Sequence, residues 1–179
     1  METLIFESHH PSSEKYYSLL TQMMDVKWKT ANIKDIEKYF SLGEQCLAVL
    51  PYAIEEWKIN DKNAGLKFEL PPSIPCRDTL PGRYMSFGKY DDARRITRQC
   101  FKIGISTKRE ASDRLKMIND CEYAIQQALL YIRYNPGILQ RTLRSKLTYV
   151  DKESLNWVLR YSKQIVKTKS GSTNALFCR

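Results

Sequence analysis

Four residues near the end of the chain have the side-chain chemistry of nucleic-acid contacts. They are Lys152, Asn156, Trp157 and Arg160. Arg can donate to a guanine edge, Asn can pair with adenine, and Lys can neutralise a phosphate. Trp157 leaves two interpretations open: contact with a thymine methyl or sugar, and packing against a neighbouring domain. Together these residue types predict a surface that binds a polyanion.

The residues between them predict the helix that must hold them. Leu155, Val158 and Leu159, followed by Ser162, recur with the period of one helical face, and such a stripe has to face a core. Asp151 stands directly before the stripe and can accept hydrogen bonds from the free N–H groups of a first helical turn. The predicted helix, residues 152–163, therefore turns its polar residues to solvent.

A hairpin is expected to follow that helix. An apolar-to-basic run at residues 165–169 leads to Ser170-Gly171-Ser172, and a second run occupies residues 174–177. Glycine supplies the positive φ that a tight hairpin turn needs. Lys167 and Lys169 are two residues apart, so they share one face of the first strand. That face is suited to lie along a phosphate backbone.

Two helical patterns are expected before Asp151. An apolar-rich pattern at Tyr123–Tyr134 runs into Asn135-Pro136-Gly137-Ile138, and a second, shorter pattern places Leu139, Leu143 and Leu147 on one face. The order predicted for the last sixty residues is thus three helices and then a hairpin.

This order is that of a winged helix-turn-helix, and residues 120–179 resemble that family. The likeness is carried by the segments at 135–138, 150–155 and 165–171. The resemblance implies that the helix at 152–163 enters the major groove of duplex DNA, with Lys152, Asn156, Trp157 and Arg160 nearest the bases. The expected phosphate contacts are Arg141, Arg144, Lys167 and Lys169.

Two positions depart from the family pattern. Leu139 stands where the second helix usually opens with Ser or Thr, and Glu153 begins the reading helix with an acid, which suits the helix dipole but repels phosphate. Winged helices also serve as protein-docking modules, and fold does not fix function. The first hypothesis is a DNA-binding transcriptional regulator, and the alternative is a protein-interaction adaptor that docks through its winged helix.

A second pattern lies at residues 74–105. Tyr84, Gly88, Tyr90, Ala93 and Cys100 fall at the spacing of a tetratricopeptide repeat, which this stretch resembles. In such a repeat, the glycine permits a turn and the small residues let two antiparallel helices approach. The stretch also contains Pro-Gly at 81–82, and this is expected to bend or shorten the first helix of the pair.

The remaining N-terminal sequence also predicts helices. One starts at Ser12 or Ser13 and runs to Met24, and a second starts at Asn32 and is expected to break at Leu50-Pro51. A third is expected to start at Pro51, and residues 66–70 are a candidate extended piece before Pro71-Pro72. The fold class is therefore mainly α, with a helical, repeat-like interaction domain at 1–118 and a winged helix-turn-helix at 119–179. The first domain is expected to dimerise or to bind a protein partner.

Composition limits the other function classes. The net charge is +9, and residues 120–179 hold ten Lys and Arg against four Asp and Glu, which is +6 of that total. This asymmetry favours a polyanionic partner such as duplex DNA. Phosphate-binding and nucleophile-elbow motifs are absent, and no histidine follows His9-His10, so neither an enzyme, a metal centre nor a cofactor site is expected.

The same composition indicates a compartment. The five cysteines are odd in number and lack a Cys-x-x-Cys spacing, which predicts reduced thiols. No signal peptide or membrane-spanning run is visible. The sequence therefore predicts a cytoplasmic protein, or a nuclear one in a eukaryote.

Overall fold

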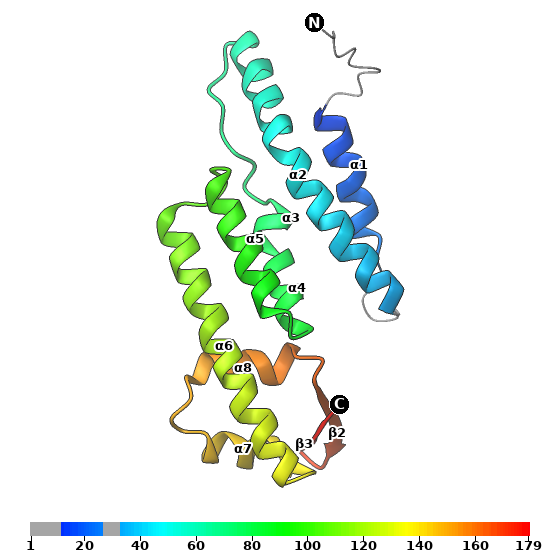
Figure 1. The fold of residues 1–179 in the computed structure, drawn as a ribbon, viewed down its shortest axis with the longest axis vertical. Helices are drawn as coiled ribbons and strands as arrows, with labels where there is room; N and C mark the ends of the chain where they lie inside the picture. Colours follow the sequence, from blue (N-terminus) through cyan, green and yellow to red (C-terminus); the bar gives the residue numbers. More distant parts are fainter. Residues whose placement is uncertain (1–11, 27–32) are drawn as a thin grey trace, which may run out of the picture. The chain divides into compact units, whose positions relative to one another are not determined.

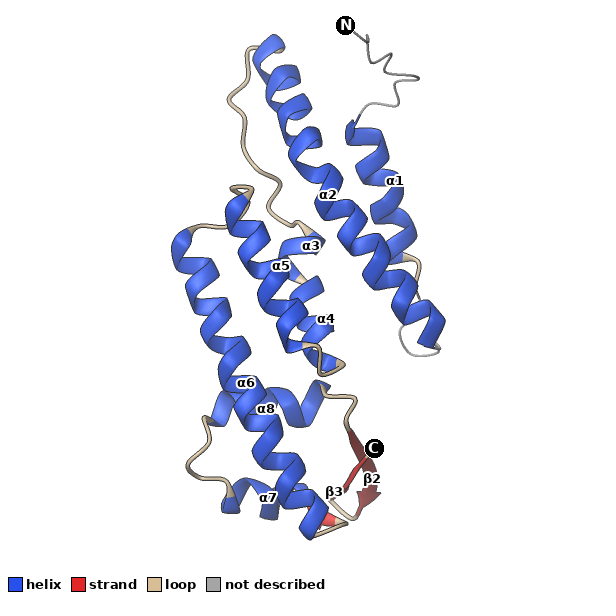
Figure 2. Ribbon diagram, in the orientation of Figure 1, coloured by secondary structure: helices blue, strands red, loops and turns tan. Residues whose placement is uncertain are grey.

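The computed structural model describes residues 12–26 and 33–179 of the chain. Figures 1 and 2 trace a mainly helical fold with a small antiparallel sheet near the C-terminal end. The chain divides into two compact units, Met1–Asp78 and Thr79–Arg179. His9-His10 and the predicted helix start at Asn32 lie outside the described residues.

The first unit is built on two helices that pack along each other, α1 (Ser12–Met24) and α2 (Ile33–Asn63). The backbone N–H and hydroxyl of Ser13 donate to the Glu56 carboxylate at 3.0 and 2.6 Å. The Tyr16 ring lies edge-on to Trp57, with centroids 5.7 Å apart. The start of α1 is thus fixed to the second half of α2, so the two helices are antiparallel.

The predicted break at Leu50-Pro51 is wrong, because α2 continues through Pro51 to Asn63. Proline removes one backbone hydrogen bond from a helix interior. Leu47, Leu50, Ala53 and Ile54, on either side of it, are all buried, and burying that apolar face offsets the loss. A tertiary core has therefore overridden a local helix breaker.

The candidate extended piece at residues 66–70 forms no strand in the structure. Among the described residues no strand lies beside it, and a single extended segment gains no ladder hydrogen bonds. A short helix, α3 (Pro75–Asp78), closes the first unit. The Cys76 thiol donates to the Gly43 carbonyl at 3.4 Å, which fixes α3 on α2.

The second unit opens with the predicted helix pair, α4 (Leu80–Ser86) and α5 (Tyr90–Lys102). Gly88 lies in the turn with φ +76°, and Ala93 and Cys100 are fully buried. Pro81 falls in the first turn of α4, where its missing N–H costs nothing. The proline therefore starts a short helix and does not bend a longer one.

One long helix, α6 (Lys108–Tyr134), follows the pair and runs unbroken through Asn119-Asp120. Thr107 and Glu110 form a capping box at its start. Its buried residues run from Ala111 to Ile132, so one apolar stripe serves the whole helix. The boundary expected between residues 118 and 119 lies inside α6, whereas the contacts divide the chain after Asp78. The helix pair and the C-terminal elements thus share one unit.

The remaining elements complete this unit in the order β1 (Ile138–Leu139), α7 (Gln140–Lys146), α8 (Lys152–Tyr161), β2 (Ile165–Ser170) and β3 (Thr173–Cys178). The sheet order is β1-β3-β2, and both pairings are antiparallel. The two-residue strand β1 was not predicted, and α8 ends two residues earlier than expected.

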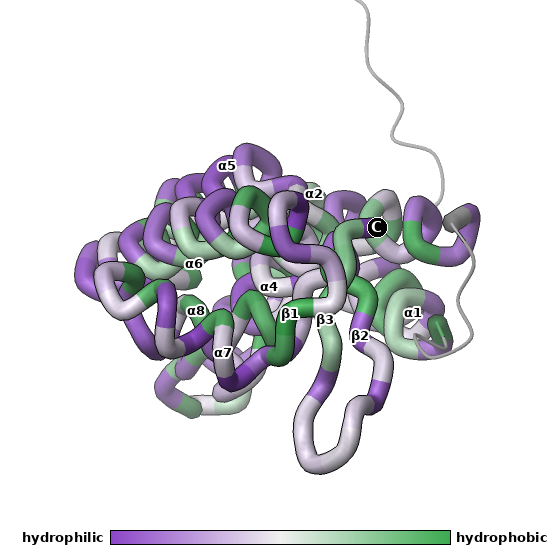
Figure 3. The backbone as a smooth tube through the Cα atoms, turned by 90° about the horizontal axis from the view of Figure 1, so that it is seen from below, coloured by the Kyte–Doolittle hydropathy of each residue, from purple (hydrophilic) through white to green (hydrophobic). Residues whose placement is uncertain are grey.

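The β2–β3 hairpin closes at Gly171, whose φ is +58°, as the sequence predicted. Strand β1 pairs with Leu176 and Ala175 in the middle of β3. The outer end of the hairpin, with the pairs Lys169–Asn174 and Ser170–Thr173, therefore has no third strand beside it among the described residues. Figure 3 shows this outer part projecting beyond α7 and β1 of the same unit, with hydrophilic residues along it.

Candidate nucleic-acid interface

Helix α8, which carries the predicted base-contacting residues, is fixed at its start and along one face. The Asp151 carboxylate accepts from the Ser154 backbone N–H at 2.8 Å, so the predicted cap is confirmed. These hydrogen bonds hold the pKa of Asp151 below its ordinary value. Leu155, Val158 and Leu159 are buried, as their spacing predicted.

The outward side of α8 carries Lys152, Asn156 and Arg160 in one stripe. They stand at i, i+4 and i+8, so they share a helical face. Lys152 and Arg160 are exposed, and Asn156 is half-buried. The structure therefore brings three of the four predicted base contacts together.

A hollow of about 460 Å³ lies between this stripe and α7. Its apolar floor is formed by Leu147, Val150 and Leu155, and the rest of its lining is polar. The polar lining residues are Arg144, Thr148, Lys152 and Asn156. Arg144 thus joins the α8 stripe, whereas Arg141 is exposed on α7 outside the hollow.

Trp157 lies apart from this stripe. It lines a different hollow of about 360 Å³, together with Met117 of α6 and several acids. Its ring centroid is 5.3 Å from that of Tyr161. The acids are Asp113, Asp120, Asp151 and Glu153. These acids favour packing over DNA contact as the role of Trp157, because carboxylates repel a phosphate backbone.

The end of α8 is joined to the first strand of the hairpin. The Lys167 ammonium donates to the Arg160 carbonyl oxygen at 3.0 Å, which suits the negative end of a helix. Partial burial and the nearby Lys163 charge lower the pKa of Lys167. The guanidinium carbon of Arg160 lies 5.2 Å from the Tyr161 ring centroid, a cation–π arrangement.

Of the two predicted wing lysines, only Lys169 is fully exposed. Lys167 lies on the sheet face that also carries the buried Ile165 and Leu176, and it is half-buried. Helix α7 begins at Gln140, and Leu139, the residue before it, provides no side-chain cap. The position before this helix is therefore held by an apolar side chain, which cannot hydrogen-bond a phosphate.

The turn between α8 and β2 packs on the turn between α4 and α5. The Lys163 backbone N–H donates to the Ser86 carbonyl at 2.8 Å. The Gln164 amide lies against Gly88, where a Cβ would come within 3.0 Å of it. The helix pair thus supports the end of α8 directly.

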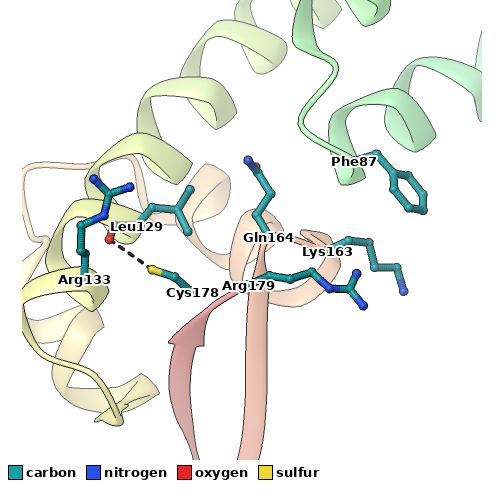
Figure 4. A pocket seen from close by; sticks show the side chains of 7 residues that line it. All are labelled: Phe87, Leu129, Arg133, Lys163, Gln164, Cys178 and Arg179. Atoms are coloured by element: carbon teal, nitrogen blue, oxygen red, sulfur yellow. Dashed lines mark hydrogen bonds between the residues drawn. The ribbon is translucent and has the colours of Figure 1, made fainter. Parts of the chain in front are cut away.

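Three basic residues that the sequence analysis did not select lie near this turn. Lys163, Arg179 and Arg133 line a hollow of about 390 Å³ at the base of the hairpin (Figure 4). The Arg179 backbone N–H donates to the Gln164 carbonyl at 2.9 Å. The sequence contained a signal for the closeness of Lys163 and Arg179. A two-residue turn at Gly171-Ser172 places residue 164 opposite residue 179 in the hairpin.

No known protein family, curated protein or solved structure matches this chain. Within residues 12–26 and 33–179, no helix has the length and apolar character needed to cross a membrane. The same residues contain no cluster of three or more His, Cys, Asp or Glu side chains placed to hold a metal ion. None of the five cysteines, all of which the structure describes, forms a disulfide, and only Cys178 is exposed.

Proposed function

We propose that α6, α7, α8 and the β2–β3 hairpin form a winged helix-turn-helix, and that the protein binds duplex DNA through α8. The element order, the short third strand β1 and the two-residue hairpin turn support this fold. The role proposed for the protein is that of a DNA-binding regulator.

The observation that carries the proposal is the α8 stripe of Lys152, Asn156 and Arg160. Its members can contact phosphate, adenine and guanine respectively. Leu155, Val158 and Leu159 are buried beside it, so the stripe is presented by a helix that its own core holds in place. A rigid helix with such side chains is the form in which the major groove is commonly read.

The position of Lys152 adds support. It is in the first turn of α8, where the helix dipole makes a cation unfavourable. No acidic side chain pairs with it among the described residues. A cation in an unfavourable, unpaired position is explained if its partner is a phosphate supplied by a ligand.

Contacts with the phosphates of the DNA backbone would come from basic side chains on either side of the stripe. Arg144 lies in the same hollow as Lys152 and Asn156, and Arg141 is exposed on the same short helix. On the other flank, Lys169 lies on the free part of the hairpin. Lys167 would contribute charge while also holding the end of α8.

A protein-docking adaptor remains the second candidate, and one observation favours it. The outer side of α6 exposes Tyr123, Leu130 and Tyr134, of which Tyr134 is 77% exposed. Their spacing places them on one helical face. Exposed apolar side chains gathered on one face mark a protein-interaction surface more often than a nucleic-acid surface.

Fluorescence anisotropy of the full chain with a labelled random duplex would test the proposal. Between 50 and 200 mM salt, the affinity should fall steeply, because phosphate contacts release counterions. A flat response without binding at 50 mM salt would rule the proposal out. A partner captured from lysate and retained after nuclease treatment would then favour the adaptor.

A further inference from the structure

The base of the β2–β3 hairpin has two adjacent hollows that share two cations. The first, of about 390 Å³, has Arg133 of α6 among its lining residues, and the second, of about 290 Å³, has Arg160 and Lys167. Lys163 and Arg179 line both. Five cations therefore surround one concave region, although they come from three separate parts of the chain.

Acidic side chains are missing from the described lining of this region. Neither hollow has an Asp or Glu among its described lining residues. None of the five cations forms an ion pair with a described residue, whereas Arg94 and Arg95 of α5 both do. The hollow around Trp157 differs, because it is lined by four acids and a single lysine, Lys116.

The cations are close enough to affect one another. Partial burial lowers the pKa of Lys167, and the nearby Lys163 charge lowers that pKa further. Figure 4 shows the side chains of Lys163 and Arg179 extending toward the same side of the hollow, while Arg133 rises from α6 on the other side. The walls of a hollow concentrate the positive electrostatic potential of the cations that line it, and a bound anion would relieve the repulsion between those cations.

We infer that this hairpin base is a phosphate-binding site centred on Lys163 and Arg179, with Arg133, Arg160 and Lys167 at its edges. Arg offers a fork of donors that fits phosphate oxygens, and Lys adds a point charge. Several cations around one cavity suit a multiply charged anion better than a single carboxylate. The phosphate can belong to a nucleic-acid backbone or to a free phosphate compound.

The two central residues can be changed without removing the bonds that hold the turn. Lys163 and Arg179 hold the turn through their backbone N–H groups, which bond to Ser86 and Gln164. A Lys163→Gln/Arg179→Gln double variant therefore keeps those bonds and loses two charges. Arg98→Gln/Lys102→Gln is the matched control, because both residues are exposed on α5 and line neither hollow.

The test uses the full chain and two probes at low salt, with thermal melting to confirm that each variant is folded. Inorganic pyrophosphate is titrated by calorimetry, and a 20-base-pair duplex by anisotropy. The Lys163/Arg179 variant should bind at least one probe roughly tenfold more weakly than wild type. The control variant should change either affinity by no more than about twofold.

The pattern of losses identifies the source of the phosphate. Loss of saturable pyrophosphate binding indicates a free phosphate compound. Loss of duplex affinity with a smaller salt slope, and no pyrophosphate binding, indicates a nucleic-acid backbone. If the Lys163/Arg179 variant and the control behave alike with both probes, the inference is overturned. The pyrophosphate result does not depend on α8 reading DNA.

Discussion

At the scale of single residues, two exposed cations, Arg160 on α8 and Lys169 on the hairpin, would make different kinds of contact with duplex DNA. Arg160 points from a helix held by its own core and can read a base, whereas Lys169 lies on the free half of the hairpin and can only add charge. The two residues carry the same charge, so their alanine variants distinguish sequence reading from simple attraction.

Arg160→Ala should weaken binding to a preferred duplex by about 1–3 kcal/mol and reduce discrimination between duplex sequences. Lys169→Ala should weaken binding to all duplexes alike and lower the salt slope by about one. Competition binding against a pool of randomised duplexes measures both effects. Equal, sequence-independent losses in the two variants would show that α8 does not read bases.

A second residue-scale prediction concerns the Asp151 cap. Its pKa is held below the ordinary value of 3.8 by hydrogen bonds from Ser154. A carboxyl whose pKa is lowered by folding contributes stability above its unfolded pKa, and that contribution is lost as the pH falls through the folded pKa. The cap should therefore weaken below about pH 4.

Asp151→Asn tests this, because an amide oxygen can still cap the helix but does not titrate there. Between pH 7 and pH 3, the melting temperature of this variant should fall by less than that of the wild type. Asp151→Ala should melt at a lower temperature than wild type at pH 7. If the wild type and Asp151→Asn have the same acid dependence, the cap contributes no pH-dependent stability.

At the scale of elements, the α4–α5 turn determines how the end of α8 is supported. Gly88 has φ +76°, and a Cβ there would meet the Gln164 amide at 3.0 Å. A left-handed conformation costs a non-glycine residue about 1–2 kcal/mol. Moving Gln164 would also disturb the turn between α8 and β2.

Gly88→Ala should therefore lower the free energy of unfolding by about 1–2 kcal/mol or more. Gly82→Ala is the matched control, because Gly82 lies in α4 and a Cβ there meets nothing within 4 Å. That variant should be neutral or stabilising by up to about 1 kcal/mol. Urea denaturation of both proteins measures the difference, and equal effects would contradict the packing described for Gly88.

A second element-scale feature is the polar tie between α5 and α6. The Arg94 guanidinium donates to Asn119 at 2.9 Å and also to Glu122, and it bonds Asp91 of its own helix at 2.8 Å. Its side chain is only 16% exposed. Arg95, its neighbour, pairs with Asp92 at 3.1 Å and is 46% exposed.

Arg94→Ala should destabilise the protein by about 1.5–3 kcal/mol, since charge-assisted, partly buried hydrogen bonds are lost. Arg95→Ala should cost no more than about 0.5 kcal/mol, as is usual for an exposed pair. Thermal melts of the two variants test this. Equal destabilisation would mean that the tie to α6 contributes nothing beyond an ordinary surface pair.

At the scale of the whole molecule, the features that depend on neighbouring residues could be predicted from the sequence, whereas those that depend on contacts between distant parts of the chain could not. Asp151, the Leu155–Leu159 stripe and Gly171 each act within a few neighbouring residues, and the structure has the expected cap, buried face and turn. The helix break predicted at Pro51 was wrong, because the burial of apolar residues around Pro51 outweighed its local effect on the helix. The two-residue strand β1 is set only by its pairing with β3, which no local pattern reveals.

The candidate site shows the same division. Lys152, Asn156 and Arg160 could be placed together from helical periodicity alone. Trp157 could not be placed, because its hollow is formed by α6, which lies far from it in sequence. The juxtaposition of Lys163 and Arg179 follows from the hairpin register, which sequence can give once the turn is recognised.

The unit boundary leads to a further prediction. A fragment of residues 79–179 keeps α6 whole and retains the turn that supports α8, whereas a fragment of residues 119–179 loses both. The longer fragment should unfold cooperatively on heating, and the shorter one should show little helix by circular dichroism. A cooperative transition in the shorter fragment would show that α8 does not need the first half of α6.

The central claim, that the α8 stripe and not overall charge binds DNA, is tested most directly with two double variants of the full chain. Lys152→Gln/Arg160→Gln removes two charges from the stripe, and Arg98→Gln/Lys102→Gln removes two from α5. At 50 mM salt, the first should weaken duplex binding by roughly tenfold or more, and the second by no more than about twofold. Equal losses in the two variants would contradict the claim.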